Sequence, residues 1–213
     1  RQDGQNKLDK IALPRMDLRK DIRRLQKRYF RHFPEEKAET GPFTEFVARF
    51  DGESLYDRKN FAGHITAGGV IVSRASRRVL LLKHRQLGKW LQPGGHVEAA
   101  DDSVLDAAYR EIAEETGIRS EQLTPLTFPG ETALPLDMDS HYIPACAAKN
   151  EAEHTHHDMR FVFLFDGDDD RVMIDRNESD AFRWVSLDEL AAIPDFRDLA
   201  PRIETLLGEA DAK

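Results

Sequence analysis

The spacing of apolar residues changes once along the chain, near residue 60. Before this point, apolar side chains recur at three- and four-residue intervals in two runs, one from Leu18 to Phe33 and one from Phe43 to Phe50. This spacing places them on one face of a helix and so predicts two helices. We therefore expect residues 1–57 to form a helical N-terminal accessory segment, used for packing or dimerisation, ahead of a main domain at 58–213.

Beyond residue 60 the pattern is typical of strands. The run HITAGGVIVS at 64–73 is rich in β-branched residues, and VLLLKH at 79–84 follows it after an Arg-Arg turn. Two such runs with a turn between them predict a pair of neighbouring strands. The chain then turns through 87–89 and leads into the Pro-Gly-Gly sequence at 93–95. The order of strand, loop and helix predicts the α/β class.

A further helix is expected directly after this loop. Ser103 stands where an N-cap belongs, and Gly117 stands where a left-handed C-terminal stop is expected. Apolar residues recur every four positions between them and form a stripe that can pack on a sheet. The members of the stripe are Val104, Ala108 and Ile112.

Three carboxylates share another face of this helix, those of Glu111, Glu114 and Glu115. A solvated acidic face is one interpretation, although like charges at this spacing cost a few tenths of a kcal/mol per pair. A metal site is the other, because the preceding glycines let backbone carbonyls approach an ion closely. Oxygen ligands of this kind suit Mg²⁺ or Mn²⁺, which also hold substrate phosphates.

The stretch from Gly95 to Ile118 resembles the Nudix box of the Nudix hydrolases, which is Gly, five residues, Glu, seven residues, then Arg-Glu-aliphatic-x-Glu-Glu-x-Gly-aliphatic. The second half matches without a gap at Arg110, Glu111, Ile112, Glu114, Glu115, Gly117 and Ile118. The first half departs from the pattern, because one extra residue precedes Arg110 and an Asp replaces the first Glu. That acid is Asp102 when counted back from Arg110, and Asp101 when counted forward from Gly95.

The resemblance covers about residues 62–207 and implies a Nudix-type α/β/α sandwich with a mixed sheet. It places strands after the helix at about 126–134, 140–147 and 159–166. A last strand is expected at 182–185, running into a short helix. The implied activity is Mg²⁺-dependent hydrolysis of the diphosphate linkage in a nucleoside diphosphate joined to another group, with Mn²⁺ as an alternative ion.

Two other activities on the same fold stay open. One is a non-catalytic nucleotide sensor, which is disfavoured because the Arg-Glu and Glu-Glu half of the box is intact. The other is an enzyme like the isopentenyl diphosphate isomerases, which use a Cys in the site. Cys146, the only cysteine, lies far from the box in the sequence.

The resemblance also implies roles for the box residues. Glu111 and Glu115 are expected to be the principal metal ligands, together with the carbonyl of Gly95. Glu114 is a further ligand, or the base that acts on the attacking water. Arg110 should orient the carboxylates, through Asp102 or Glu111, rather than touch the substrate.

Three residues outside the regular box are weaker candidates. Glu98 lies in the loop near the expected metals and is either a further ligand or an exposed acid. Glu178 precedes the last strand, where some family members keep a catalytic or metal-binding acid. Arg85 follows the strand that enters the site and is assigned to phosphate binding, with an ordinary surface cation as the alternative.

Acids and imidazoles alternate in two runs outside the box, LDMDSH at 136–141 and HTHHDMR at 154–160. Residues two apart share one face of a strand, so two extended neighbouring runs would form one polar patch. Its members are Asp137, Asp139, His141, His154, His156, Asp158 and Arg160. The patch is a solvated surface, a wall of the substrate pocket with Arg160 on a phosphate, or a second metal site whose imidazoles suit Zn²⁺ or Mn²⁺.

Composition narrows the partners. The net charge of -8 argues against non-specific nucleic-acid binding, which leaves a small-molecule nucleoside diphosphate derivative as the expected partner. A homodimer through the N-terminal helices stays open. A single cysteine forms no intrachain disulfide, and no apolar run reaches membrane-spanning length. We therefore expect a cytoplasmic enzyme.

Overall fold

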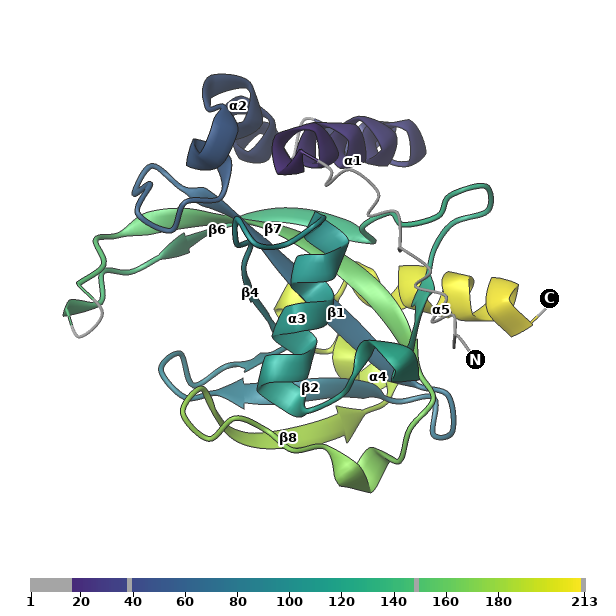
Figure 1. Cartoon of the computed structure of the whole chain (residues 1–213). Helices are drawn as coiled ribbons and strands as arrows, with labels where there is room; N and C mark the ends of the chain where they lie inside the picture. The colour runs from purple at the N-terminus through teal and green to yellow at the C-terminus, as the bar shows by residue number, and fades with distance from the viewer. Residues whose placement is uncertain (1–16, 38–39, 148–149, 212–213) are drawn as a thin grey trace, which may run out of the picture.

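The computed structural model describes residues 17–37, 40–147 and 150–211, which form a mixed sheet of eight strands between two helical layers (Figure 1). The strands are β1 (His64–Ser73), β2 (Val79–His84), β3 (Trp90–Leu91), β4 (Gly94–His96), β5 (Leu123–Leu126), β6 (Asp137–Ile143), β7 (His154–Phe165) and β8 (Ser179–Val185). The α-helices are α1 (Leu18–His32), α2 (Gly41–Arg49), α3 (Val104–Thr116), α4 (Leu187–Ala191) and α5 (Leu199–Asp211). Short 3₁₀ turns are η1 (Pro34–Lys37), η2 (Gly52–Leu55), η3 (Ser120–Gln122), η5 (Asp169–Arg171) and η6 (Pro194–Phe196).

Strand β1 is the centre of the sheet. It pairs in parallel with β7 and antiparallel with β2 and β4. The parallel register runs from His64 opposite His156 to Ser73 opposite Phe165. Strand β7 in turn pairs antiparallel with β6 along its first half and with β5 along its second half. All ten residues of β1 are buried, as expected for a strand covered on both faces.

Two apolar cores lie on the two faces of this sheet. On one face α1, α2 and α3 pack on side chains that include Ile65, Ile71 and Phe163. On the other face α4 and α5 pack on side chains that include Val70 and Val72. Figure 1 shows α3 in front of β1 and the yellow helix α5 behind the sheet. The predicted α/β/α sandwich with a mixed sheet is confirmed.

The two predicted N-terminal helices are α1 and α2. The apolar face of α1 is fully buried at Ile22 and Tyr29, and that of α2 at Phe43. The side chain of Asp21 is also buried, at 1% exposure, and its Oδ2 accepts a hydrogen bond of 3.0 Å from the backbone N–H of Val104. Because Val104 is the first residue of α3, the N-terminal segment reaches the helix that carries the carboxylates.

The strands expected after α3 differ from the prediction. The strand predicted at 126–134 is wrong, since β5 ends at Leu126 and the next strand begins only at Asp137. Pro129, Gly130 and Pro135 interrupt this stretch, and Gly130 has a φ of 80° that a strand does not use. The strand predicted at 140–147 is β6, which starts and ends earlier, and Pro144 directly follows its last residue.

Candidate active site

The carboxylate helix α3 is held tightly against the central strand. Its N-cap is Ser103, whose Oγ accepts a hydrogen bond of 3.1 Å from the backbone N–H of Asp106. It ends at Gly117, which has a φ of 68°. A Cβ added at Gly69 of β1 would lie 2.3 Å from Cδ1 of Ile112, so only glycine permits this approach. Both predicted ends of the helix are confirmed.

Two of the three carboxylates converge on the backbone of β4. Glu115 is buried at 8% exposure, and its Oε1 accepts a hydrogen bond of 2.7 Å from the backbone N–H of Gly94. Glu111 lies against Gly95, where an added Cβ would stand 2.6 Å from Glu111 Oε2. The side chain of Glu114 is 60% exposed. The geometry therefore groups Glu111 and Glu115 with the Gly95 backbone and leaves Glu114 nearer to solvent.

Arg110 is fixed by carboxylates on both sides. Its Nε donates to Asp101 Oδ1 at 3.0 Å and its Nη2 donates to Asp101 Oδ2 at 3.1 Å. Its Nη1 donates to Glu111 Oε1 at 2.8 Å, and its Nη2 also donates to the carbonyl of His96 at 2.7 Å. The acid that pairs with the arginine is thus Asp101 rather than Asp102. The extra residue of the box follows Asp101.

Desolvation and mutual repulsion act together on the carboxyl groups of Glu115 and Glu111. Burial raises the pKa of Glu115 to about 8; the Gly94 N–H opposes this, and the charges of Glu178 and Glu111 add to it. Burial also raises the pKa of Glu111, against the effect of Arg110. Glu178 lines the same cavity and lies near enough for its charge to raise both pKa values, although it is more than 60 residues away in the sequence. Such a donor set, with more negative than positive charge, fits Mg²⁺ or Mn²⁺.

Two other predicted residues differ in their placement. Glu98 is exposed and lines the same cavity as the box carboxylates, while its backbone N–H donates to Asp101 Oδ2 at 2.7 Å. Arg85 is not brought to this cavity. Its Nη1 donates to the carbonyl of Arg176 at 2.9 Å, and its side chain is 59% exposed. The structure therefore places Arg85 on the surface, next to the start of β8.

A cavity of about 1800 Å³ lies beside the carboxylates. Its lining includes the box residues Gly95, Glu111, Glu114 and Glu115, the acids Glu98 and Glu178, and the patch residues Asp137, Asp139, His141, His154, His156, Asp158 and Arg160. The runs that carry the patch pair as β6 and β7, with Asp139 opposite Asp158 and His141 opposite His156. The expectation that both runs are extended and adjacent is confirmed.

Charged members of the patch form hydrogen bonds with one another and with neighbouring groups. Arg160 is only 8% exposed, and its Nε donates to Asp137 Oδ2 at 2.7 Å. Its Nη1 also lies 3.4 Å from the carbonyl of Asp195, to which it donates. Asp158 accepts a hydrogen bond from the hydroxyl of Thr66. The guanidinium of Arg160 is thus already compensated by a carboxylate.

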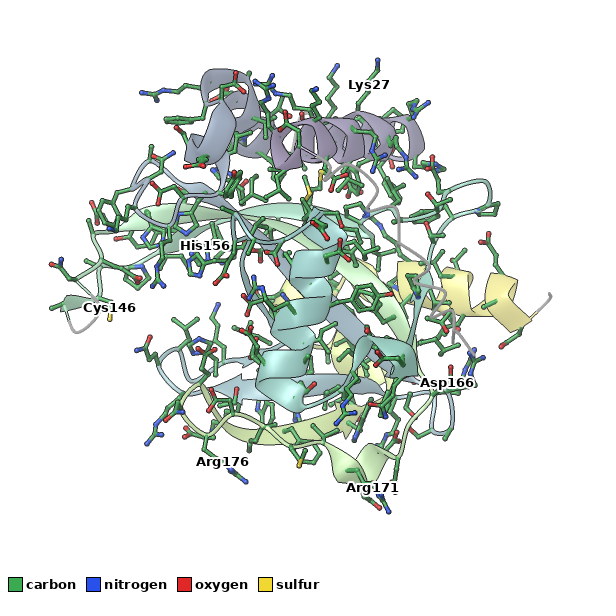
Figure 2. All side chains as sticks on the ribbon, viewed as in Figure 1. Lys27, Cys146, His156, Asp166, Arg171 and Arg176 are labelled. Atoms are coloured by element: carbon green, nitrogen blue, oxygen red, sulfur yellow. The ribbon has the colours of Figure 1, made fainter. Side chains whose placement is uncertain are left out.

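Two further histidines, which were not predicted from the sequence, belong to this polar patch. His64 is the first residue of β1 and lies opposite His156 in the parallel register; His96 is the last residue of β4. Burial lowers the pKa of His64 and of His96 to about 4 and that of His156 to about 2, so all three imidazoles are neutral at pH 7. The sequence signal that could have identified them is their position: His64 precedes an apolar run, and His96 follows the Pro-Gly-Gly loop. Figure 2 shows His156 between α3 and the hairpin end that carries Cys146.

A sandwich with a carboxylate-bearing helix against its central strand is the architecture of a Nudix hydrolase. The family model described as NUDIX domain matches residues 63–206, so the chain belongs to this family. None of the helices in the described part of the chain is long and apolar enough to cross a bilayer.

Named relatives match parts of the chain. An RNA pyrophosphohydrolase from Bartonella tribocorum is 30% identical over 126 residues, covering 55% of this chain and 69% of the relative. Another, from Thioalkalivibrio sulfidiphilus, is 32% identical over 127 residues, with 55% and 67% covered. The phosphatase NudJ of Escherichia coli is 40% identical over 63 residues, with 29% and 39% covered. The solved structure of a C. elegans Ap4A hydrolase binary complex aligns with a TM-score of 0.50 and 22% identity over 70% of this chain and 98% of that one, a likeness of fold alone.

The contact between Gly95 and Glu111 leads to a first prediction. Gly95→Ala should lower kcat roughly 100-fold, because the new methyl displaces the Glu111 carboxylate by about an ångström. Stability should change little, since the atoms that must move belong to a flexible side-chain end. Steady-state kinetics and thermal unfolding measure the two effects separately.

The matched control is Gly208→Ala on α5, where no atom lies within 4 Å of the added Cβ. It should leave kcat unchanged and stabilise the helix by about 0.5–1 kcal/mol. A Gly95→Ala protein that turns over at the wild-type rate would show that Glu111 has no fixed role beside this backbone.

Proposed function

We propose that the chain hydrolyses the diphosphate linkage of a nucleoside diphosphate joined to another group, with Mg²⁺ as its cation. One observation carries this proposal: the buried carboxylate of Glu115 and the half-buried carboxylate of Glu111 meet the β4 backbone on the wall of a large cavity. Burial raises the pKa of both carboxyl groups, and a bound cation would stabilise their ionised forms. Mn²⁺ has the same preference for oxygen ligands and is the alternative ion.

The proposed ligands are the carboxylates of Glu111 and Glu115 and the carbonyl of Gly95. A divalent cation there supplies neutralisation of the diphosphate charge and activation of water. Arg110 acts on Glu111 rather than on the substrate, because its guanidinium is already shared between Asp101 and Glu111. It holds the Glu111 carboxylate in one orientation, which keeps the ligand geometry fixed before substrate arrives.

Two further carboxylates compete for the role of base. Glu114 is exposed on the helix face that lines the cavity, and Glu178 is electrostatically coupled to both Glu111 and Glu115. Either carboxylate can accept the proton of the attacking water at one of its oxygens. Glu98 lies on the same wall and is proposed as a further ligand from the loop.

The substrate is proposed to extend from the carboxylates along the face formed by β6 and β7. His154, His156, Asp158 and Arg160 line this part of the cavity. Its volume of about 1800 Å³ accommodates a nucleotide derivative. Arg160 shapes this wall through its pair with Asp137. Arg85 is not part of the proposal, because it lies on the surface.

The test is a panel of diphosphate compounds with Mg²⁺ or Mn²⁺. It should contain nucleotide sugars, ADP-ribose, dinucleoside polyphosphates, oxidised nucleoside triphosphates and RNA with a phosphorylated or capped 5′ end. Released phosphate and product mass identify the bond that is cut. We expect at least one compound to be cleaved within its diphosphate, and a chelator to stop the reaction. A folded protein that binds Mg²⁺ but cleaves none of them would favour a nucleotide sensor instead.

A further inference from the structure

Five histidines from four strands gather at one wall of the cavity, four of them lining it and His64 buried directly behind them, and we refer to them as the imidazole cluster. Its members are His64 on β1, His96 on β4, His141 on β6, and His154 and His156 on β7. The ring centroids are 4.9 Å apart for His64–His96, 4.8 Å for His64–His154, 4.8 Å for His64–His156, 5.3 Å for His96–His156, 5.0 Å for His154–His156 and 5.6 Å for His141–His156. Imidazoles gathered in this way bring ring nitrogens from four strands into one small volume.

The sheet topology builds this cluster. Parallel pairing of β1 with β7 sets His64 opposite His156, and antiparallel pairing of β6 with β7 sets His141 opposite the same residue. Strand β4 adds His96, which lies opposite Thr66 on β1. The cluster is therefore fixed by backbone hydrogen bonds on three sides and is not a loose surface tract.

Three of these rings have the spacing of metal ligands. One nitrogen each from His64, His96 and His156 lies within 4.8 Å of the other two. In a tetrahedral zinc site with Zn–N distances near 2.0–2.1 Å, two ligand nitrogens stand roughly 3.3 Å apart. Closing this triad around one ion therefore requires its nitrogens to approach one another by up to about 1.5 Å.

A buried nitrogen of the triad has no hydrogen-bond partner. His64 is 0% exposed, and within the described parts of the chain its Nε2 is buried without a donor or acceptor. A buried polar atom left in this state destabilises the fold unless a ligand satisfies it. Its Nδ1 lies 3.5 Å from the carbonyl of Asn60, and because a carbonyl only accepts, this contact favours the tautomer with the proton on Nδ1 and the lone pair on Nε2.

A second imidazole shows the same arrangement. The Nδ1 of His154 lies 2.7 Å from the carbonyl of Ala152, so Nδ1 is its donor as well. A backbone carbonyl on the far ring nitrogen is the usual support behind a metal-ligating histidine. The Nε2 of His154 lies 3.1 Å from the Nε2 of His156. This contact can satisfy one pair of nitrogens, but it leaves His64 Nε2 without a partner.

The ligand chemistry separates this triad from the box carboxylates. Imidazole nitrogens favour zinc and its neighbours among the late transition metals, whereas Mg²⁺ prefers oxygen ligands. We propose that His64, His96 and His156 bind one Zn²⁺ ion, or a similar late transition-metal ion, at the cavity wall. His154, whose Nε2 lies 3.1 Å from that of His156, is a further candidate ligand. Because His96 directly follows Gly95, the proposed zinc ion would add positive charge close to the proposed Mg²⁺ site. There it would attract an anionic phosphoryl group of the substrate.

The experiment is a zinc titration of the metal-stripped full chain in excess Mg²⁺, with a chromophoric chelator as competitor. Wild-type protein should bind one equivalent of Zn²⁺. His96→Asn and His156→Asn should each weaken the Zn²⁺ affinity at least about 100-fold. Removing a hydrogen-bond partner of a metal ligand already weakens metal affinity by up to about 100-fold, and removing the ligand itself should cost no less. Equal affinity in wild type and both variants would overturn the assignment.

Two controls locate the ion. His32→Asn removes an imidazole that pairs with Glu131 on a different part of the surface, and it should keep the wild-type affinity. Glu115→Gln removes a proposed Mg²⁺ ligand and should also keep it. Loss of zinc binding in Glu115→Gln with retention in His156→Asn would place the ion at the carboxylates and overturn the proposal.

A second measurement does not depend on how the variants fold. X-ray absorption of the wild-type zinc complex should show a first shell with at least three imidazole nitrogens. A shell made only of oxygen would contradict the site. Circular dichroism of each variant then shows whether a lost affinity reflects a lost ligand or a lost fold. Because zinc binding is measured without substrate, its outcome is independent of the proposed hydrolysis.

Discussion

Glu115→Gln is expected to reduce kcat by roughly 10³-fold or more while leaving the protein folded. The change keeps the size of the side chain, its helix propensity and an oxygen that can accept from the Gly94 N–H. It removes the negative charge, which is what a divalent cation requires from this position. Kinetics over a range of Mg²⁺ concentrations, together with Mg²⁺ binding by calorimetry, measure both consequences.

The matched control is Glu204→Gln on α5, an exposed glutamate that does not line the cavity. It carries the same chemical change and should turn over like the wild type. Glu114→Gln distinguishes the two roles proposed for Glu114. If Glu114 is the base, the substitution should lower kcat and leave the Mg²⁺ affinity unchanged. If Glu114 is a metal ligand, it should lower both. Wild-type turnover and Mg²⁺ binding in Glu115→Gln would refute the proposed cation site.

The elements that sequence alone located correctly are those with local signals. The bounds of β1 and β2 agree with the runs read from the sequence, because both runs are mostly apolar and the turn between them is short. The ends of α3 follow from an N-capping serine and a C-terminal glycine, which act within one turn of the helix. The shared face of Glu111, Glu114 and Glu115 could be predicted from the helical repeat alone.

The features that sequence did not settle depend on partners distant in the chain. The choice between Asp101 and Asp102 could not be made by counting, since an inserted residue shifts the register and only the ion pair with Arg110 decides it. His64 joins the imidazole cluster because β1 pairs with β7, more than 90 residues later. No periodicity encodes such a pairing.

The position of the N-terminal helices also depends on partners that are distant in the chain. Their apolar faces were predicted, but what those faces cover was not. The structure packs them on the core that α3 shares with the sheet, although the NUDIX match begins only at residue 63. The contact between Asp21 and Val104 makes this packing specific, because it satisfies a backbone donor at the start of the carboxylate helix.

Asp21→Ala should therefore lower the free energy of unfolding by about 2–3 kcal/mol. The buried N–H of Val104 loses its acceptor, at about 1–3 kcal/mol, and the N-terminus of α3 loses a nearby negative charge. Asp21→Asn keeps an acceptor oxygen without the charge and should recover roughly half of the loss. Urea unfolding monitored by circular dichroism gives the three values.

Asp17→Ala is the control that distinguishes this contact from a general effect on α1. Asp17 caps α1 itself, through a hydrogen bond of 3.1 Å from the Arg19 backbone N–H, and its side chain is 41% exposed. Its loss should cost about 1 kcal/mol, the ordinary value for a helix cap. If Asp21→Ala costs no more than Asp17→Ala, the aspartate does not support α3. The N-terminal segment would then stabilise the domain through its apolar faces alone.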